Sequence, residues 1–403
     1  MNVPKLRFKE FNDEWQPINL ADIFQYFSTN SLSREQLSES GILKNLHYGD
    51  IHRKYNSIVN ENKEITSYVK DLNYVNKYEL LKNNDLIFAD ASEDYEGIGK
   101  AVEVVNVNNN TVSGLHTILV RDNSNVFAPM FKGYYFNSPT VHNQIRVLAN
   151  GFKVYGISKE AINKLNIKIP SIKEQSKIAN TLYLLDKKIE LQTKKVEDLK
   201  LFKKGLLIKE FNNKKCNNKL KECFDFGKAG GTPKSTNKDY YNGYIPFLSI
   251  SDMTTQGKYI YYTDKSITEA GLNNSTAWLV PKNSIIISMY ASYGLVSINK
   301  IDLTTSQAMF NMVINKNYVV EYIYYYLYYL YISNFYNSIV STGTQSNLNA
   351  EQIKLLDIYI PYYNEQKRIY EQFSKIDFKI NLEQKKLNEL LYLKKGLMQN
   401  MFV

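Results

Sequence analysis

The carboxylates of this 403-residue chain are the first side chains to test for chemistry. Glu93, Asp94 and Glu96 form an acidic loop beside a glycine turn. Such a loop can hold a metal ion, or it can accept hydrogen bonds from amino groups. A loop that accepts hydrogen bonds or faces solvent is the favoured interpretation, and metal binding is the alternative.

Catalytic motifs are missing or incomplete in the sequence. Nucleases place a Glu-x-Lys pair on a strand beside an aspartate, and this triplet starts here at Glu61, Glu365 and Glu383. Two of the three lie on expected helices, and a lysine-rich chain produces the triplet by chance. The sequence has no P-loop, no Gly-x-Gly-x-x-Gly and no Asn-Pro-Pro-aromatic motif of adenine methyltransferases. We therefore expect no catalytic residue in this chain.

Cysteine and histidine are too sparse for a metal site. Cys216 and Cys223 are the only cysteines, and their spacing fits neither a zinc pattern nor a disulfide scaffold. The four histidines have no partner pattern, so we expect each on the surface or in a loop. The sequence predicts no metal and a reducing compartment, the cytoplasm.

An internal duplication sets the elements that must position the remaining side chains. A shift of 191 residues aligns residues 157–211 with 348–402 without a gap, with 21 identities over 55 positions. Chance would give about a tenth of the positions or less. We therefore predict a first globular part over 1–156, a first helical segment over 157–211, a second globular part over 212–347 and a second helical segment over 348–403.

Each helical segment is expected to start with a short strand and to continue as a long helix. Pro170 and Pro361 end the strands. Beyond them, apolar residues recur at steps of three and four, which is the seam of a coiled coil. A helix lying on its own globular part is the alternative. The predicted seam residues are Ile178, Leu182, Leu185, Ile189, Val196 and Leu199 in the first copy, and Ile369, Phe373, Ile376, Ile380, Leu387 and Leu390 in the second.

Polar residues interrupt the seam at matching places, at Gln192 and Glu383 and again at Lys203 and Lys394. A helix of about 35 residues is roughly 50 Å long, and the first one leads from one globular part to the other. If the seams pair, the second helix runs back antiparallel to the first. We therefore expect two globular parts at the ends of an antiparallel coiled coil with an internal pseudo-twofold duplication.

An uncharged stretch over residues 322–339 has to be tested as a membrane span. Tyrosine dominates it, and the hydroxyls and amides of residues such as Ser333 and Asn334 are costly in a bilayer. We predict a buried aromatic helix and no membrane contact.

We predict that both globular parts are α+β, because short β-type runs alternate with Gly, Asn and Asp. The runs are 85–88, 101–105 and 117–120 in the first part, and 245–248, 284–287 and 295–298 in the second. Loops between them carry Ser, Thr, Asn, Gln, Arg and Lys, which suit base edges and phosphates. For any single loop, a solvated polar loop is the alternative.

The charge distribution favours an anionic partner. The net charge is +10, but residues 1–156 carry −2 while the three later segments carry +6, +4 and +2. We expect the first globular part to bind nucleic acid poorly alone and to depend on local Lys and Arg and on partner subunits.

Short motifs recur in a fixed order along the chain. They are Leu6-Arg7-Phe8, Glu14-Trp15, residues 20–24, Gly231-Thr232-Pro233, Ile245-Pro246, residues 267–272, Gly343-Thr344 and the duplicated Ile-Pro-x3-Glu-Gln before each long helix. Together with the duplication, these motifs resemble the specificity subunit of type I restriction-modification systems, and the resemblance covers essentially the whole chain. Two departures are the missing Gly-Thr-Pro opening in the first part and the missing counterpart of Trp15 in the second half, so we expect readers of different subtypes.

The resemblance implies a non-catalytic reader with two target-recognition domains, one for each half of a split, asymmetric sequence on double-stranded DNA. The paired helices would act as a ruler of roughly one DNA turn or more and as the docking surface for two methyltransferase subunits. Restriction/translocase subunits would join this assembly. The partners would bind S-adenosylmethionine, ATP and Mg, and they would methylate adenine N6.

On this basis we predict a set of DNA-facing residues in the loops. The competing hypothesis is a coiled-coil adaptor that joins two protein partners and ignores DNA. The predicted DNA-binding residues are Tyr48, His52, Arg53, Lys54, His116 and Lys153 in the first domain, and Thr232, Lys234, Ser235, Ser292, Tyr293, Gln307, Thr344, Gln345 and Asn347 in the second.

Overall fold

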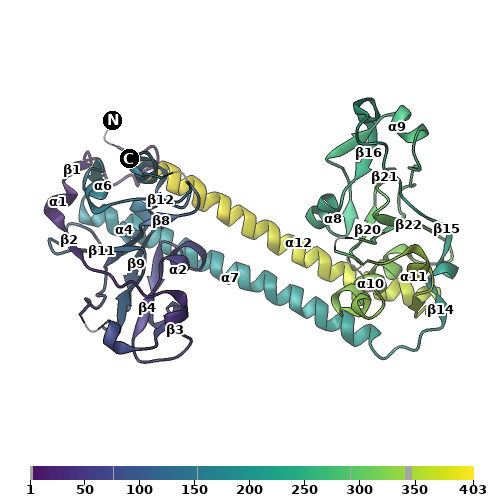
Figure 1. The fold of residues 1–403 in the computed structure, drawn as a ribbon, viewed down its shortest axis with the longest axis horizontal. Helices are drawn as coiled ribbons and strands as arrows, with labels where there is room; N and C mark the ends of the chain where they lie inside the picture. The colour runs from purple at the N-terminus through teal and green to yellow at the C-terminus, as the bar shows by residue number, and fades with distance from the viewer. Residues whose placement is uncertain (1–2, 76, 152, 291, 341–346) are drawn as a thin grey trace. The chain divides into compact units, whose positions relative to one another are not determined.

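The duplication reappears as two units, each of which holds one globular part and a segment of both long helices (Figure 1). The computed structural model describes residues 3–75, 77–151, 153–290, 292–340 and 347–403. Unit 1 consists of Met1–Thr193 and Lys385–Val403, and unit 2 consists of Lys194–Gln384. The predicted boundaries at residues 156, 211 and 347 stay predictions.

Over the described residues, unit 1 is built on a five-stranded sheet. Its strands lie in the order β2 (Phe24–Phe27), β11 (Thr117–Asp122), β7 (Leu86–Ala89), β9 (Ala101–Val105) and β5 (Ile58–Asn60). Neighbours are antiparallel except β5 and β9, which are parallel. Successive residues of β7 enter two different apolar clusters, Leu86 and Phe88 in one and Ile87 and Ala89 in the other. The sheet is therefore buried on both faces, which explains the unbroken apolar runs of its central strands.

A smaller sheet and several helices complete unit 1. One face of the five-stranded sheet is covered by the aromatic helix α4 (Phe131–Phe136) and by α5 (Pro139–Leu148). The buried side chains of both helices belong to the same cluster as Trp15. The small sheet contains β10 (Thr111–Ser113), β4 (Lys44–Leu46), β6 (Tyr68–Val69) and β3 (Leu37–Ser38). The remaining named elements are α1 (Leu20–Ile23), α2 (Tyr48–Arg53), α3 (Glu61–Glu64), α6 (Lys159–Asn163), and the pairs β1 (Gln16–Ile18) with β13 (Ile167–Ile169) and β8 (Ala91–Ser92) with β12 (Tyr155–Gly156).

Unit 2 repeats this topology strand for strand in its main sheet. The order is β15 (Phe224–Ala229), β22 (Met309–Ile314), β19 (Ile285–Ser288), β20 (Val296–Asn299) and β17 (Tyr259–Ile260). Here too the edge strand β17 is parallel to its neighbour and the other pairs are antiparallel. The other elements are β16 (Tyr241–Leu248), β18 (Lys265–Ile267), β21 (Thr304–Thr305), β14 (Asn218–Lys219), β23 (Asp357–Ile358), α8 (Ile250–Gln256), α9 (Glu269–Asn273), α10 (Val320–Ile332) and α11 (Ala350–Lys354).

The predicted α+β class and the six predicted strands are confirmed. The two globular parts have the same sheet topology although they align poorly in sequence, because backbone pairing tolerates any apolar residue of suitable shape. The tyrosine-rich stretch forms the buried helix α10, which ends earlier than expected, at Ile332. Asn334 then takes a left-handed conformation and a short 3-10 turn follows. No helix of the described residues is long and apolar enough to span a membrane.

The two long helices, α7 (Ile172–Phe211) and α12 (Tyr363–Asn400), run antiparallel within each unit. In unit 2, Lys203 pairs with Asp377 at 2.5 Å and Lys195 pairs with Glu383 at 3.0 Å, so residue numbers rise on one helix as they fall on the other. In unit 1, Lys394 pairs with Asp186 at 2.5 Å. The predicted antiparallel pair is confirmed, and three of the four polar seam residues form ion pairs between the helices.

A tyrosine, an aspartate and a lysine join each globular part to the helix pair. In unit 1, the Tyr134 hydroxyl donates to Asp186 Oδ2 at 2.9 Å, and the same carboxylate binds Lys394. In unit 2, the Tyr325 hydroxyl donates to Asp377 Oδ2 at 2.5 Å, and that carboxylate binds Lys203. A shift of 191 residues converts each triad into the other, so the duplication extends into helices α4 and α10.

The duplicated glutamine of the Glu-Gln motif has a structural role in both units. The Gln175 side chain accepts from Ala128 N at 2.9 Å and donates to Pro170 O at 2.9 Å. Gln366 accepts from Val319 N at 3.0 Å and donates to Pro361 O at 2.9 Å. Both side chains are buried, so each satisfies backbone groups that water cannot reach.

Every predicted seam residue is buried or half-buried. The ends of the seam pack into the globular parts: Ile178 and Leu182 belong to the main cluster of unit 1, and Ile369 and Phe373 belong to that of unit 2. The interpretation of a helix lying on its own domain therefore holds for the helix ends, where α7 and α12 form part of the domain cores.

Candidate functional site

Several loops of unit 1 meet at one edge of its main sheet. β7 ends at this edge, and β9 and β11 begin there. Asp90, which follows β7, donates its backbone N–H to His116 O at 3.0 Å and accepts from Ile157 N at 2.9 Å. Tyr155 pairs with Ser92 across strands β12 and β8. The loops that carry His116 and Lys153 therefore lie next to the acidic loop.

A pocket of about 730 Å³ opens at this edge, between α2 and the acidic loop. It is lined by four predicted DNA-binding residues, Tyr48, His52, Arg53 and Lys54, and across from them by residues that include Glu93, Asp94 and Lys100. Tyr48 contacts both histidines of the predicted set, with ring centroids 6.1 Å from His52 and 5.2 Å from His116. The fold thus brings five of the six predicted residues of unit 1 together.

The cations of this pocket differ in whether a carboxylate of the same unit already binds them. Lys54 is held by Asp50 at 3.1 Å, and Arg34 binds the same carboxylate at 3.0 Å. Burial raises the pKa of Asp50, but its hydrogen bonds to Arg34 and Lys54 outweigh burial and lower the pKa below its ordinary value. Arg53 is exposed and has no ion pair within the described part of the chain. Arg53 is therefore the available guanidinium at this site.

Two of the four histidines are partly or fully buried. His47 lies in the short connection between β4 and α2, is 6% exposed, caps the start of α2 by accepting from Gly49 N, and has a pKa lowered to about 4 by burial and by nearby Arg34. His142 lies half-buried on helix α5 and bonds to Ile98 O at 2.8 Å. The expectation of a surface or loop position is therefore wrong for His142, whose imidazole satisfies a backbone carbonyl instead of facing water.

The acidic loop is tied to its own surroundings. Asp94 accepts from Gly97 N at 2.5 Å, and Glu96 forms an ion pair with Arg146. The residues described here contain no group of three or more His, Cys, Asp or Glu side chains that could hold a metal ion. The exposed Glu93 lines the pocket and remains able to accept hydrogen bonds from a ligand.

The predicted loops of unit 2 gather at the equivalent edge of its sheet. Thr232 donates to the Gln307 side chain, and Gly230 N bonds to Met309 O at 3.0 Å. Met289 N donates to Ala308 O at 2.8 Å, and Met289 O accepts from Leu348 N at 2.9 Å. The loops after β15, after β19 and before β22 therefore lie side by side with the segment that starts at Asn347.

The individual residues of that edge differ in exposure. Lys234, Ser235 and Ser292 are exposed, and Ser292 has a left-handed φ of 60°. The Tyr293 hydroxyl donates to Asn337 at 2.8 Å, and Asn347 is half-buried. Thr344 and Gln345 lie outside the described residues, as does Gly343-Thr344 of the resemblance. The role of these residues in binding stays a prediction.

Sequence reasoning missed a second pocket of about 690 Å³ in unit 2. It lies between α8, the start of β20, helix α10 and the segments of α7 and α12 that belong to this unit. Lys200, Lys258, Tyr324, Tyr328 and Asp377 are among its lining residues. It overlaps the place of the unit 1 pocket in the sheet topology, because α8 and the β19–β20 loop correspond to α2 and the β8–β9 loop, whereas α10 and the long helices line only the pocket of unit 2. Asp377 matches Asp186 under the 191-residue shift, but nothing in the sequence connected it with the other residues of the pocket.

Comparison with known proteins assigns the chain to a family. Residues 12–201 and 213–392 match the family model of the type I restriction modification DNA specificity domain. The type I restriction enzyme MjaIX specificity subunit of Methanocaldococcus jannaschii is 31% identical over 176 residues, which cover 43% of this chain and 40% of that protein. The putative MjaX specificity subunit of the same organism is 23% identical over 98% of this chain and 95% of its own length.

A third relative and a solved structure agree with this result. The HindI specificity subunit of Haemophilus influenzae is 28% identical over 42% of this chain and 38% of its own length. The alignments thus span about two fifths of the MjaIX and HindI subunits. The crystal structure of the type I restriction-modification S subunit from M. genitalium has the same fold, with a TM-score of 0.59 and 16% identity over 100% of this chain and 99% of its own. With the family model matching nearly all of both repeats, the chain belongs to the type I restriction modification DNA specificity family.

Proposed function

We propose that this chain is the DNA-reading, non-catalytic specificity subunit of a type I restriction-modification complex, and that it acts in the cytoplasm on a split, asymmetric DNA sequence. The observation that carries the proposal is the convergence of polar and cationic loops at the same sheet edge in two units of one topology. Two readers with unlike side chains suit two unlike half-sites. The MjaIX, HindI and MjaX relatives are all named as specificity subunits, which supports this role.

The side chains at these edges have the chemistry that DNA recognition needs. In unit 1, Arg53 and Lys153 are exposed cations without an ion pair among the described residues. Guanidinium groups bind guanine O6 and N7 or phosphate oxygens. In unit 2, Thr232 and Gln307 present hydroxyl and amide groups that can read base edges. The edge of unit 1 would bind one half-site and the edge of unit 2 the other.

Exposed apolar residues on the long helices support docking of two copies of one partner. In unit 1, Tyr392 and Leu393 of α12 are 80% and 50% exposed. Their counterparts by the 191-residue shift, Leu201 and Phe202 of α7, lie in unit 2 and are 67% and 57% exposed. Exposed apolar residues at repeated positions mark protein interaction surfaces.

The proposed partners on these surfaces are two methyltransferase subunits, with restriction/translocase subunits joining the same complex. A solved structure of the same fold, with a TM-score of 0.60 and 15% identity over 97% of this chain, concerns the complex assembly of a type I system. S-adenosylmethionine, ATP and Mg would bind to these partners, which would methylate adenine N6. This chain would supply the target choice.

The test is a substitution that affects one half-site. With the methyltransferase present, Arg53→Ala should lower methylation of one half-site about tenfold and leave the preference at the other half-site unchanged. Long-read mapping of methylated adenines measures both half-sites at once. The matched control is Lys82→Ala, an exposed cation of unit 1 before the start of β7, at the opposite edge of the sheet.

Two results would contradict the proposal. If Arg53→Ala kept the wild-type pattern at both half-sites, the assignment of this residue to the reading site would be wrong. If the chain joined its partners but gave them no sequence preference in a gel shift on varied duplexes, the adaptor hypothesis would replace DNA reading.

A further inference from the structure

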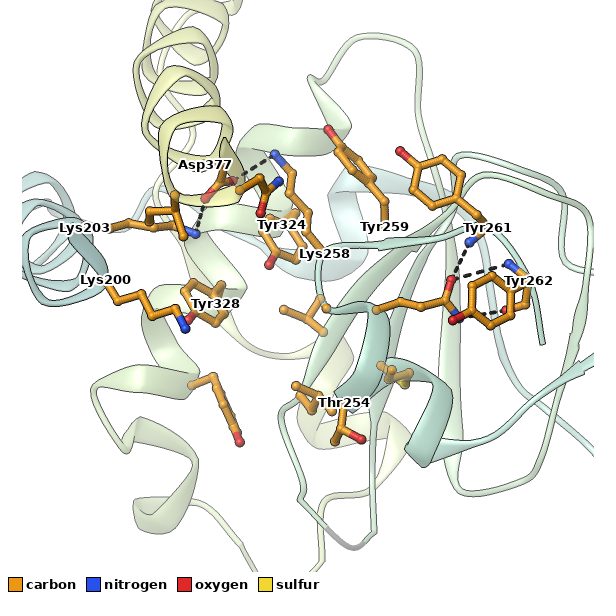
Figure 2. Close-up of a pocket in the computed structure, with 18 residues that line it drawn as sticks. Lys200, Lys203, Thr254, Lys258, Tyr259, Tyr261, Tyr262, Tyr324, Tyr328 and Asp377 are labelled. Carbon is orange, nitrogen blue, oxygen red and sulfur yellow. Dashed lines mark hydrogen bonds and ion pairs between the residues drawn. The ribbon is translucent and has the colours of Figure 1, made fainter. Parts of the chain in front are cut away.

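The pocket of unit 2 concentrates positive charge around one carboxylate. Asp377 binds Lys203 at 2.5 Å and lies 3.6 Å from Lys258 (Figure 2). Its Oδ2 also accepts the Tyr325 hydroxyl. Lys200 lines the same pocket and has no ion pair among the residues that the structure describes. Three lysines and one carboxylate therefore line the pocket, and two of the lysines lie against that carboxylate.

Lys258 is the most enclosed of these cations. Its side chain is 11% exposed, and its Nζ lies 4.2 Å from the ring centroid of Tyr325 and 4.8 Å from that of Tyr259. Nζ also donates to the Tyr325 hydroxyl at 2.7 Å. Burial lowers the pKa of Lys258 to about 8, although Asp377 and Glu321 act to raise it. The negative charge inside the unit therefore compensates this ammonium only in part.

Two tyrosines add hydroxyl groups without partners. Tyr324 is 4% exposed, lines the pocket and makes no hydrogen bond through its hydroxyl within the described ranges. Its ring stacks on Tyr328 with centroids 5.9 Å apart and planes 5° from parallel. Figure 2 shows the Lys200 side chain extending toward Tyr328. Among the described residues, the Tyr324 hydroxyl is not one of the fully buried polar atoms that lack a partner, so it opens to the pocket, where a ligand or water can hydrogen-bond to it.

We propose that this pocket binds a phosphate group of the DNA backbone, with Lys200 as the accessible cation, Tyr324 as a hydroxyl donor and Lys203 and Lys258 as the charges beneath them. This inference rests on the proposed DNA-reading function. A phosphate oxygen accepts hydrogen bonds from ammonium and phenol groups alike, and its charge compensates the surplus cation. The pocket lies at the sheet edge that carries Ser292 and Tyr293, since Leu295 and Val296 line it. The contact would hold the second half-site in place without reading a base.

The experiment measures the salt dependence of DNA affinity for the full chain bound to its methyltransferase. Lys200→Ala should weaken binding to all duplexes alike and reduce the slope of log K against log salt by about 1. Tyr324→Phe should weaken binding about threefold with an unchanged slope. Lys209→Ala, an exposed lysine of the same helix outside the pocket, should leave affinity and slope at wild-type values.

A second measurement follows Lys258 by NMR of its side chain while duplex DNA or inorganic phosphate is added. DNA should raise the pKa of Lys258, because a nearby anion stabilises the ammonium form. If inorganic phosphate raised the pKa and DNA did not, the pocket would be a site for a free anion and the proposal would be overturned.

The remaining outcomes separate this inference from the proposed function. If Lys200→Ala and Lys209→Ala had the same slope while Arg53→Ala still changed one half-site, the phosphate contact would be wrong and DNA reading would stand. If Lys200→Ala weakened assembly with the methyltransferase but left the slope for DNA unchanged, an acidic segment of the partner would occupy the pocket. If no variant altered any binding to DNA, the proposed function itself would fail.

Discussion

The pockets of unit 1 and unit 2 lie beside corresponding elements of one sheet topology, but their charges are arranged differently. In unit 1 the central carboxylate, Asp50, belongs to the reading domain and is bound by Arg34 and Lys54 of the same domain. In unit 2 the central carboxylate, Asp377, belongs to helix α12 and is bound by Lys203 of α7 and approached by Lys258 of the domain. The site of unit 2 is therefore assembled from the domain and the helix pair together.

The contacts that join domain to helices are the same in both units. Tyr134 and Tyr325, Asp186 and Asp377, and Lys394 and Lys203 occupy equivalent positions. The Tyr–Asp–Lys contacts are shared by the two units and the pockets are not, which shows which part of the duplication was retained. The scaffold kept the residues that fix its geometry, while the residues that face a ligand diverged.

The largest expected effect comes from removing the shared aspartates. Asp377→Ala should lower the free energy of unfolding of unit 2 by about 3 kcal/mol, and Asp186→Ala should lower that of unit 1 by about 2 kcal/mol. The first loss is larger because Asp377 compensates two ammonium groups and Asp186 pairs with one.

Urea unfolding followed by tryptophan fluorescence separates the two units, because Trp15 lies in unit 1 and Trp278 in unit 2 and the chain has no other tryptophan. Trp15→Phe and Trp278→Phe backgrounds isolate each signal. Asp264→Ala, an exposed aspartate of unit 2, should change stability by less than about 0.5 kcal/mol. Equal losses for Asp186→Ala and Asp377→Ala would refute the predicted difference between the units.

The duplicated glutamines test the part of the comparison that should be symmetric. Gln175→Ala and Gln366→Ala should each cost about 2 kcal/mol, because each leaves a backbone N–H and a carbonyl buried without a partner. The same unfolding assay measures both, with the exposed Gln399→Ala as a near-neutral control. A loss of stability in only one unit would show that the two glutamines do not have equivalent roles.

The smallest expected effect is a pH dependence specific to unit 2. Lys258 has a pKa of about 8 in the folded chain and near 10.5 when unfolded, so between these values the unfolded state binds more protons. The stability of the wild type should therefore rise with pH relative to Lys258→Met, by a little under about 2 kcal/mol from pH 7.5 to 9.5. A pH-independent difference between the two proteins, like that expected for Lys209→Met, would show that Lys258 is not desolvated.

Some of the site followed from sequence and some did not. Tyr48, His52, Arg53 and Lys54 lie within seven positions of the chain, so a segment rich in such residues is visible without a structure. The expected loop is wrong for this segment, because Tyr48–Arg53 forms helix α2. The pocket of unit 2 draws on residues 200, 258, 324 and 377, which no local pattern connects. The burial of His47 was missed for a related reason, since Arg34, which lies beside its ring, comes from 13 residues earlier in the chain.

By itself the sequence determined the duplication, the α+β class and the antiparallel helices, because periodicity and identity between repeats are local or internal properties of the chain. Only the tertiary structure decided that the seam ends enter the domain cores and that Asp377 gathers lysines from α7 and from the domain. Ion pairs and buried hydroxyls depend on which distant residues the packing brings within about 4 Å, and spacing along the chain carries no record of that distance.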